Sequence, residues 1–392
     1  MLLKIVWKNI AAKKLNSFLC ILLMMFGIAI ISLIMVLGKQ IEEKFTKNIT
    51  GIDMVVGAKG SPLQLILSGI YQIDSPTGNV PLEDVQKLTS NPLVKEMIPL
   101  SMGDNHKGYR IVGTNSKYLK NFNAVFAEGK TFSGDFEAVI GSNTAANTGL
   151  KLGDTFSGSH GLESDGDVHD HKKYKVVGVL QQNNSVIDNL VITNLGSVWA
   201  IHEHGEEDTL AKKEITCALI KFRSPLGLMT LPRNINQNTV MQAALPAIEI
   251  NRLFELMGVG FDTLKILAVV IMVISGISVF VTLYNSLKER KYEMALMLSM
   301  GAQRFKLFMM LLLEGIFLSL TGFLLGIIVS RIGVLILSGQ LNKNYHYSLN
   351  QLSLQSEEIF LLIGALIVGI FAAGIPSLGV YRINISKTLA ED

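Results

Sequence analysis

The sequence predicts a membrane protein with four transmembrane α-helices and an extracytoplasmic α+β domain inserted between spans one and two. The first observation behind this fold class is composition. Of 392 residues 49% are hydrophobic, and the mean hydropathy of +0.39 is too high for an ordinary soluble protein. The second observation is clustering. The apolar residues gather in four runs, and the length of each run is close to the roughly 20 residues that cross a bilayer core. Residues 39–265 contain no such run.

Charge and cysteine content exclude other classes of protein. A net charge of +3 gives no sign of a nucleic-acid surface. Cys20 lies in an apolar run and Cys217 in the region between runs, so we expect no disulfide framework. The first apolar run has no small-residue cleavage site and is long enough to span a bilayer, which predicts a retained signal anchor.

Residues 1–16 predict a cytoplasmic amphipathic helix. Trp7 suits the membrane interface. Four lysines make the segment basic: Lys4, Lys8, Lys13 and Lys14. Residues 17–38 follow as predicted transmembrane helix 1. Because the basic segment precedes this span, we expect the N-terminus inside the cell and the next segment outside it.

Residues 39–265 predict two stalk helices and the extracytoplasmic domain. Leu37, Ile41 and Phe45 recur every four residues, which predicts a helix that continues out of the membrane. A second helical pattern, with Ile250 and Leu253 on one side, leads into the second span. Between the stalks, short apolar segments bounded by turn residues predict strands. These segments are 52–56, 107–112, 136–140, 173–180, 189–192 and 214–222.

The remaining apolar runs predict transmembrane helices 2, 3 and 4 at residues 266–287, 305–330 and 359–380. An outer loop at 331–358 separates the last two spans, and residues 381–392 form a tail. Basic residues crowd the turn between spans two and three, which places that turn, the tail and both termini in the cytoplasm. These residues are Lys288, Arg290, Lys291, Arg304 and Lys306. Arg331 and Lys343 lie on the opposite side, against the trend.

Residues 288–304, between spans two and three, predict a short cytoplasmic helix. The segment ends at Gly301, a residue suited to the left-handed conformation that terminates helices. Its apolar side chains are Met294, Leu296, Met297, Leu298 and Met300. Methionine-rich faces are adaptable docking surfaces. One interpretation is therefore a coupling helix that seats in a cytoplasmic ATPase, and the other is a loop helix that rests on lipid headgroups.

This segment carries a family resemblance. Glu293-Met-Ala-Leu-Met-Leu-Ser-Met-Gly-Ala302 resembles the "E-I-G-I-L-R-A-L-G-A" signature of FtsX/MacB-type ABC transporter permeases. Glu293, Gly301 and Ala302 match directly, while Leu298 stands where the family usually has a basic residue. Further phrases resemble the family's periplasmic domain and tail. They are Glu128-Gly-Lys-Thr-Phe132, Glu137-Ala-Val-Ile-Gly-Ser, Gly149-Leu-Lys-Leu-Gly-Asp-Thr155, Tyr174-Lys-Val-Val-Gly-Val-Leu180 and Pro376-Ser-Leu-Gly-Val-Tyr-Arg382.

The resemblance implies a permease subunit of a bacterial cytoplasmic (inner) membrane, with a MacB-like domain outside and no ATPase domain of its own. It implies a homodimer that binds a cytoplasmic ABC ATPase, and ATP and Mg on that partner chain. A periplasmic adaptor or lipoprotein and membrane lipid are further implied partners. The permease would not be an enzyme. The residues that would contact the ATPase are Glu293, Met294, Leu296, Met297, Met300, Gly301 and Ala302.

The implied function is mechanotransmission. ATP-driven motion would pass from the cytoplasm to the extracytoplasmic domain, for export or extraction of a peptide, drug, haem-like molecule or lipoprotein. One alternative is an FtsX-like signal transmitter that activates a cell-wall hydrolase. Residues 124–131 satisfy a relaxed phosphate-loop pattern, but their intervening residues are bulky and no second ATPase motif accompanies them. We therefore expect no nucleotide site in this chain and find no catalytic constellation.

Histidines motivate a second alternative, a metal-linked transport component. Five of the seven histidines fall within 45 residues: His160, His169, His171, His202 and His204. Imidazole, with the nearby carboxylates, suits zinc or another divalent metal. His-x-His on an exposed loop is nevertheless a signal of low specificity, and the opposing interpretation is a polar insertion whose histidines only titrate.

The third predicted span contains an ionisable residue, Glu314, followed by Gly315, Gly322 and Gly326. An ionisable group in a membrane helix is a functional candidate. Small residues let membrane helices approach closely, which favours a membrane-packing role for all four residues. Substrate or proton handling by Glu314 is the alternative.

Overall fold

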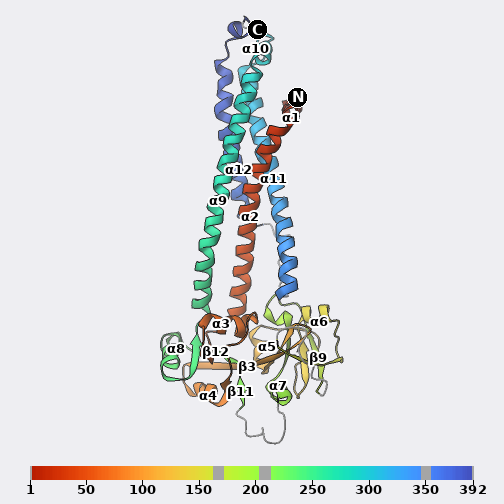
Figure 1. Ribbon diagram of the computed structural model, residues 1–392, viewed down its shortest axis with the longest axis vertical. Helices are drawn as coiled ribbons and strands as arrows, with labels where there is room; N and C mark the ends of the chain where they lie inside the picture. The colour runs from red at the N-terminus through yellow and green to blue at the C-terminus, as the bar shows by residue number, and fades with distance from the viewer. Residues whose placement is uncertain (1, 162–171, 203–212, 346–354, 391–392) are drawn as a thin grey trace. The chain divides into compact units, whose positions relative to one another are not determined.

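The structure, a computed structural model, describes residues 2–161, 172–202, 213–345 and 355–390 (Figure 1). The chain divides into two compact units. One consists of residues 1–40 and 257–392 and is called the helical unit below. The other consists of residues 41–256 and is called the sheet unit. In the sequence, the sheet unit therefore lies between the first and second apolar runs.

The helical unit contains four helices that are long and apolar enough to cross a membrane, as judged over the described residues. They are α2 (Lys14–Ile49), α9 (Pro246–Glu289), α11 (Arg304–Tyr345) and α12 (Glu358–Leu378). Shorter helices complete the unit: α1 (Leu2–Ala12), α10 (Lys291–Ser299), η5 (Gly379–Arg382) and α13 (Ile385–Ala390). Helices α2 and α9 extend beyond their apolar runs into the sheet unit, because helical periodicity continues through residues 41–49 and 246–256.

The sheet unit contains one mixed sheet of eleven strands among the described residues. Nine strands follow the order β13-β1-β12-β3-β4-β10-β6-β9-β5. Their bounds are β1 Met54–Ala58, β3 Val94–His106, β4 Tyr109–Thr114, β5 Phe126–Gly129, β6 Glu137–Ile140, β9 Tyr174–Leu180, β10 Leu190–Asn194, β12 Cys217–Phe222 and β13 Met241–Ala244. Strands β7 (Thr155–Phe156) and β8 (Ser159–His160) pair with β9 and β3. A separate pair joins β2 (Val80–Pro81) to β11 (Glu214–Ile215).

The long strand β3 holds the two halves of this sheet together. Its first part pairs with β12 through Leu100, and its second part pairs with β4 from Ser101 onward. The β10–β4 and β6–β9 pairs are parallel, and the others on this path are antiparallel. Residues 98–102 of β3 are all buried, so the strand lacks the period-two alternation that makes half-buried strands visible in a sequence.

Short helices alternate with the strands along the chain of the sheet unit. Their bounds are α3 Pro62–Ile66, η1 Leu67–Tyr71, α4 Leu82–Lys87, η2 Leu88–Ser90, α5 Ser116–Asn121, α6 Ser142–Thr148, η3 Val186–Asn189, α7 Leu195–His202 and α8 Leu226–Asn238. Helices α3 and η1 form one short apolar segment whose buried side chains join the largest core of the sheet unit.

The ends of both long stalk helices are built into that same core. Phe45 of α2 lies 4.4 Å from the ring of Tyr71 and 5.8 Å from the ring of Phe254 of α9. The Tyr71 hydroxyl donates a 2.9 Å hydrogen bond to the backbone oxygen of Phe45. The buried Asn48 side chain accepts a 2.9 Å bond from the backbone N–H of Val186. Residues 41–49 and 246–256 are thus integral parts of the sheet unit rather than tethers.

Candidate functional site

The candidate site is built on α10, the short helix between α9 and α11. Its end follows from backbone chemistry at Gly301, which adopts φ +93°. Beyond it, the N–H of Ala302 donates to the oxygen of Met297 at 2.9 Å, which satisfies a carbonyl of the last turn. Among the described residues, no atom outside the adjacent residues lies within 4 Å of a Cβ placed on Gly301, so the backbone conformation, and not crowding, requires glycine here.

The apolar residues of α10 divide between two faces. Met294 and Ala295 are fully buried and Leu298 is 9% exposed, and all three lie in one cluster with residues of the other helices of the unit. On the other face, Met300 is 79% exposed and Leu296 is 46% exposed. The helix therefore fixes itself to the bundle with one apolar face and leaves a second apolar edge uncovered.

The seven residues predicted to contact an ATPase differ in their exposure to solvent. Glu293, Leu296, Met300 and Gly301 are exposed. Met297 and Ala302 are half-buried, and Met294 points into the bundle. The exposed edge also includes Tyr292, which is 43% exposed and was not among the predicted contacts. Its signal in the sequence is the four-residue spacing of Tyr292, Leu296 and Met300, which places them on one stripe of a helix.

The C-terminal segment supports α10 from the side. Helix α13 packs against α10, and Arg304 at the start of α11 binds the backbone of the segment that precedes α13. The Arg304 guanidinium donates to the backbone oxygens of Tyr381 at 2.5 Å, Ile383 at 3.1 Å and Val380 at 3.4 Å. Carbonyl groups at a helix end lack partners within the helix and carry the negative end of its dipole, so a cation is well placed there.

Replacing Arg304 with methionine is expected to loosen this segment. The change removes charge-assisted hydrogen bonds to three carbonyls, and such bonds contribute about 1.5–3 kcal/mol each. Hydrogen exchange followed by mass spectrometry should show amide exchange across residues 383–390 accelerated by about tenfold or more. The exposed Lys306→Met variant is the matched control. Unchanged exchange in the Arg304 variant would show that the tail is held by its apolar contacts alone.

Helix α1 joins the same end of the helical unit. Its buried residue Val6 lies in the cluster that contains Met294, and the Trp7 ring meets Phe317 of α11 edge-on at 5.7 Å. The Lys13 ammonium lies 2.5 Å from the Glu289 carboxylate at the end of α9. The amphipathic helix expected at residues 1–16 is thus formed over residues 2–12 and has a packed face as well as the exposed Trp7.

The predicted packing residues of the third span lie where α11 crosses its neighbours. A Cβ on Gly315 would come within 2.4 Å of Ala373 on α12. A Cβ on Gly322 would lie 2.7 Å from Met24, and one on Gly326 would lie 2.9 Å from Ile28, both on α2. Glu314 is buried, and its Oε2 atom has no hydrogen-bond partner among the described residues.

The predicted metal site remains a prediction. His169, His171 and His204 lie outside the described residues. His160 ends β8 and His202 ends α7, but their side chains are not described. Within the described ranges, no group of three or more His, Cys, Asp or Glu side chains could hold a metal ion.

Comparison with known proteins matches most of the chain to two families. Residues 17–225 match the MacB-like periplasmic core domain, and residues 265–385 match the FtsX-like permease C-terminal family. No curated protein matches the chain.

Two solved structures are similar in part. One is the periplasmic region of MacB from Actinobacillus actinomycetemcomitans, at 11% identity and a TM-score of 0.35, covering 54% of this chain and 98% of that one. The other is the extracellular domain of the ABC-type transporter YknZ from Gram-positive bacteria, at 15% identity and a TM-score of 0.30, covering 48% and 98%.

The periplasmic-core match alone spans more than half of the 392 residues, and the permease match covers the three apolar helices that follow the sheet unit. Four apolar helices accompany these matches, as a multi-pass membrane protein requires. The family predicted from the signature at residues 293–302 is thereby confirmed. The chain belongs to the FtsX/MacB-type permeases, the membrane components of ABC transporters.

Proposed function

We propose that this permease transmits the motion of a cytoplasmic ATPase to its sheet unit, which works outside the cytoplasm in the export or extraction of a substrate. One observation carries the proposal. Helix α10 lies between two apolar helices, packs one face on the bundle and leaves Tyr292, Leu296 and Met300 uncovered on the other. A partner that buries this edge removes apolar surface from water, at about 25 cal/mol per Å².

The path from α10 to the sheet unit is short in covalent terms. Helix α9 ends at Glu289, directly before α10, and its other end carries Ile250 and Phe254 into the sheet core. A displacement at α10 therefore acts on a single helix that begins inside the sheet unit. In energetic terms, ATP binding would bias the permease between two arrangements, by as much as the ATPase contacts differ between them.

The remaining expectations are part of the same proposal. Two copies of the chain would bind two ATPase subunits, with ATP and Mg held by those subunits. Both termini would lie in the cytoplasm of a bacterial inner membrane, as the basic residues around α10 favour. The substrate would be a peptide, drug, haem-like molecule or lipoprotein, and a periplasmic adaptor or lipoprotein would complete the assembly.

Photocrosslinking from α10 tests the contact. A photoreactive amino acid at Met300 or Leu296 is expected to capture an ATPase subunit in native membranes, which mass spectrometry then identifies. The same probe at the fully buried Met294 is the matched control and should capture residues of this chain instead. Exclusive capture of lipid from Met300 and Leu296 would contradict the proposal, because it would mean that the helix rests on headgroups.

A further inference from the structure

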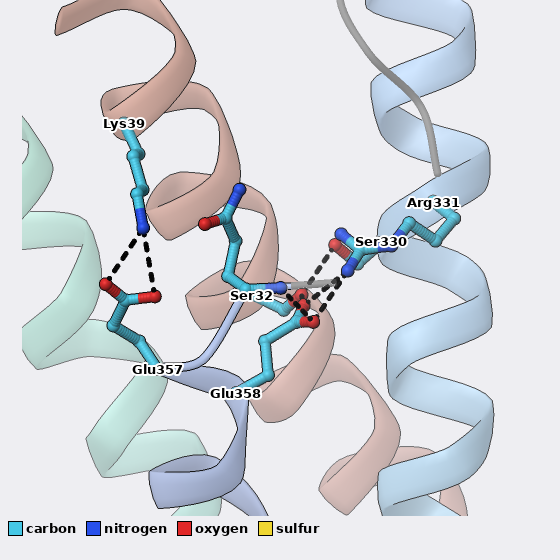
Figure 2. Close-up of polar contacts among 7 residues, drawn as sticks. Ser32, Lys39, Ser330, Arg331, Glu357 and Glu358 are labelled. Carbon is cyan, nitrogen blue, oxygen red and sulfur yellow. Dashed lines mark hydrogen bonds and ion pairs between the residues drawn. The ribbon is translucent and has the colours of Figure 1, made fainter. Parts of the chain in front are cut away.

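A buried polar cluster joins three apolar helices of the helical unit (Figure 2). At its centre is the carboxylate of Glu358, the first residue of α12. The Nη2 atom of Arg331 on α11 donates to both carboxylate oxygens, at 2.8 and 2.6 Å. The Ser32 hydroxyl on α2 donates to Oε1 at 2.7 Å and lies 2.9 Å from the Ser330 hydroxyl on α11. The backbone N–H of Gln355 donates to Oε2 at 3.2 Å.

Burial makes the loss of any of these hydrogen bonds costly. Ser32 is 0% exposed, Ser330 1% and Glu358 5%. Each oxygen of the Glu358 carboxylate has two partners, so its charge is satisfied only while Ser32 and Arg331 stay where they are. Rotation or sliding of one helix would leave a charge or a hydroxyl buried without a partner, which is costly in an apolar surrounding.

A second contact ties α2 to α12. The Lys39 ammonium lies 3.1 Å from the Glu357 carboxylate, as Figure 2 shows beside the buried cluster. Lys39 follows Ser32 by seven residues, or about two helical turns, so both face α12 from one side of α2. This pair is partly exposed and contributes little by itself. It does extend the polar contact between these two helices.

Helix α2 does not adjoin α10 in the sequence, and among the described residues it shares a buried cluster with α10 only near its N-terminal end, through Cys20 and the preceding helix α1. Helices α9 and α11 flank α10 directly, and α12 reaches it through η5 and α13. Helix α2 is separated from α10 in the sequence by the whole sheet unit and α9. Motion at α10 therefore reaches α2 through side-chain contacts, either those of α1 or those of α2 itself with its neighbours.

The apolar contacts of α2 differ in kind from the polar cluster. Val36 packs against Val334 of α11 in a small buried cluster. Apolar contacts hold α2 by shape, as at Gly326 against Ile28, whereas a satisfied buried carboxylate also requires particular partners at particular positions. The polar cluster thus adds a directional constraint on the rotation and axial position of α2 relative to α11 and α12.

We propose that the Ser32–Ser330–Arg331–Glu358 cluster fastens α2 to α11 and α12, so that residues 41–49 of α2 in the sheet core follow the helices driven from α10. Glu358 is its central positioning residue. The inference rests on the proposed function, since it assigns to one polar contact the transfer of motion to the first stalk.

Cysteine cross-linking in the full chain, with its ATPase in lipid nanodiscs, tests the fastening. Val36→Cys and Val334→Cys are introduced into a Cys20→Ser, Cys217→Ala background, and the disulfide yield is measured nucleotide-free and after vanadate trapping. Two variants disrupt the cluster. Ser32→Ala removes the two hydroxyl contacts of α2 with Glu358 and Ser330 and keeps the ion pair. Arg331→Met/Glu358→Leu removes the ion pair and leaves no unpaired charge. The control is Asp262→Leu/Lys265→Met, an exposed pair on α9 at 3.1 Å.

The proposal expects equal disulfide yield in both nucleotide states for the parent and the control. In both cluster variants the yield should fall severalfold on trapping, with the larger loss in Ser32→Ala, because the double variant keeps the Ser32–Ser330 contact between α2 and α11. The rate of ATP hydrolysis should equal that of the parent, because the substitutions leave α10 unchanged. This rate also serves as a folding control, since a general folding defect would lower it. Parent-like yields in Ser32→Ala and in the double variant would overturn the proposal.

Different measurements test the ATPase contact at α10 and the fastening of α2. Absence of an ATPase from the Met300 and Leu296 photocrosslinks in the parent overturns the proposed function. The nucleotide-free disulfide yields still test the cluster, because a lower yield in Ser32→Ala than in the parent supports fastening without any ATPase. Yields equal to the parent's in both nucleotide states, in Ser32→Ala and in the double variant, overturn the fastening even when the ATPase contact at α10 is present.

Discussion

Replacing Glu358 alone with leucine is expected to destabilise the helical unit by about 3–5 kcal/mol, because the buried Arg331 would keep its charge without a carboxylate. The Arg331 side chain is only 16% exposed, and its Nη1 atom already has no hydrogen-bond partner among the described residues. The measurement is the apparent melting temperature of the purified protein in detergent, followed by fluorescence-detected gel filtration.

The double variant Arg331→Met/Glu358→Leu is the control for this loss. Replacing both members of a buried ion pair with apolar residues of similar volume is often neutral or stabilising. We therefore expect its melting temperature to lie close to that of the parent. A single variant as stable as the double variant would show that water or lipid headgroups reach the Arg331 guanidinium, and that the pair is not a buried one.

Gly326→Leu is expected to separate α11 from α2. A Cβ at this position would lie 2.9 Å from the Cβ of Ile28 and 2.9 Å from the backbone oxygen of Met25, so the backbone itself would have to shift. Overpacking of this kind costs about 1–3 kcal/mol, and here it also displaces two helices that other residues hold together. The expected result is a lower melting temperature and a reduced Val36–Val334 disulfide yield.

Gly364→Leu on α12 provides the matched control, since a Cβ there meets no atom within 4 Å among the described residues. It adds the same side chain to another apolar helix and should leave both readouts unchanged. Equal losses in the two variants would mean that helix flexibility, and not the α2–α11 crossing, sets the effect.

The helices of this fold could be predicted from the sequence more completely than the sheet. Four apolar runs and the four-residue spacing of Leu37, Ile41 and Phe45 are local signals, and the structure has four apolar helices with α2 continuing to Ile49. The segments expected to be strands at 173–180 and 189–192 correspond to strands β9 (Tyr174–Leu180) and β10 (Leu190–Asn194). Strand β3 was missed, since its buried middle does not alternate, and the parallel β6–β9 pairing joins residues too far apart for any local pattern.

At the candidate site, Gly301 and the helix before it follow from local sequence, but the two faces of that helix do not. The apolar residues of α10 lie on more than one face of the helix. The sequence pattern alone therefore cannot distinguish Met294, which is buried, from Met300, which is exposed. The assignment depends on α13 and α1, whose positions are set by tertiary contacts. Arg331 shows the same limit, because the sequence presents it as a basic residue on the unexpected side, and only the structure pairs it with Glu358.

That pairing has a consequence for how the protein enters the membrane. During synthesis α11 is complete before residue 358 exists, so the Arg331 guanidinium has no carboxylate partner until the next helix is made. An unpaired charge on an apolar helix disfavours release of that helix into lipid. The third and fourth apolar helices are therefore expected to leave the insertion machinery as a pair. The Arg331–Glu358 ion pair would then determine the order in which these helices enter the membrane.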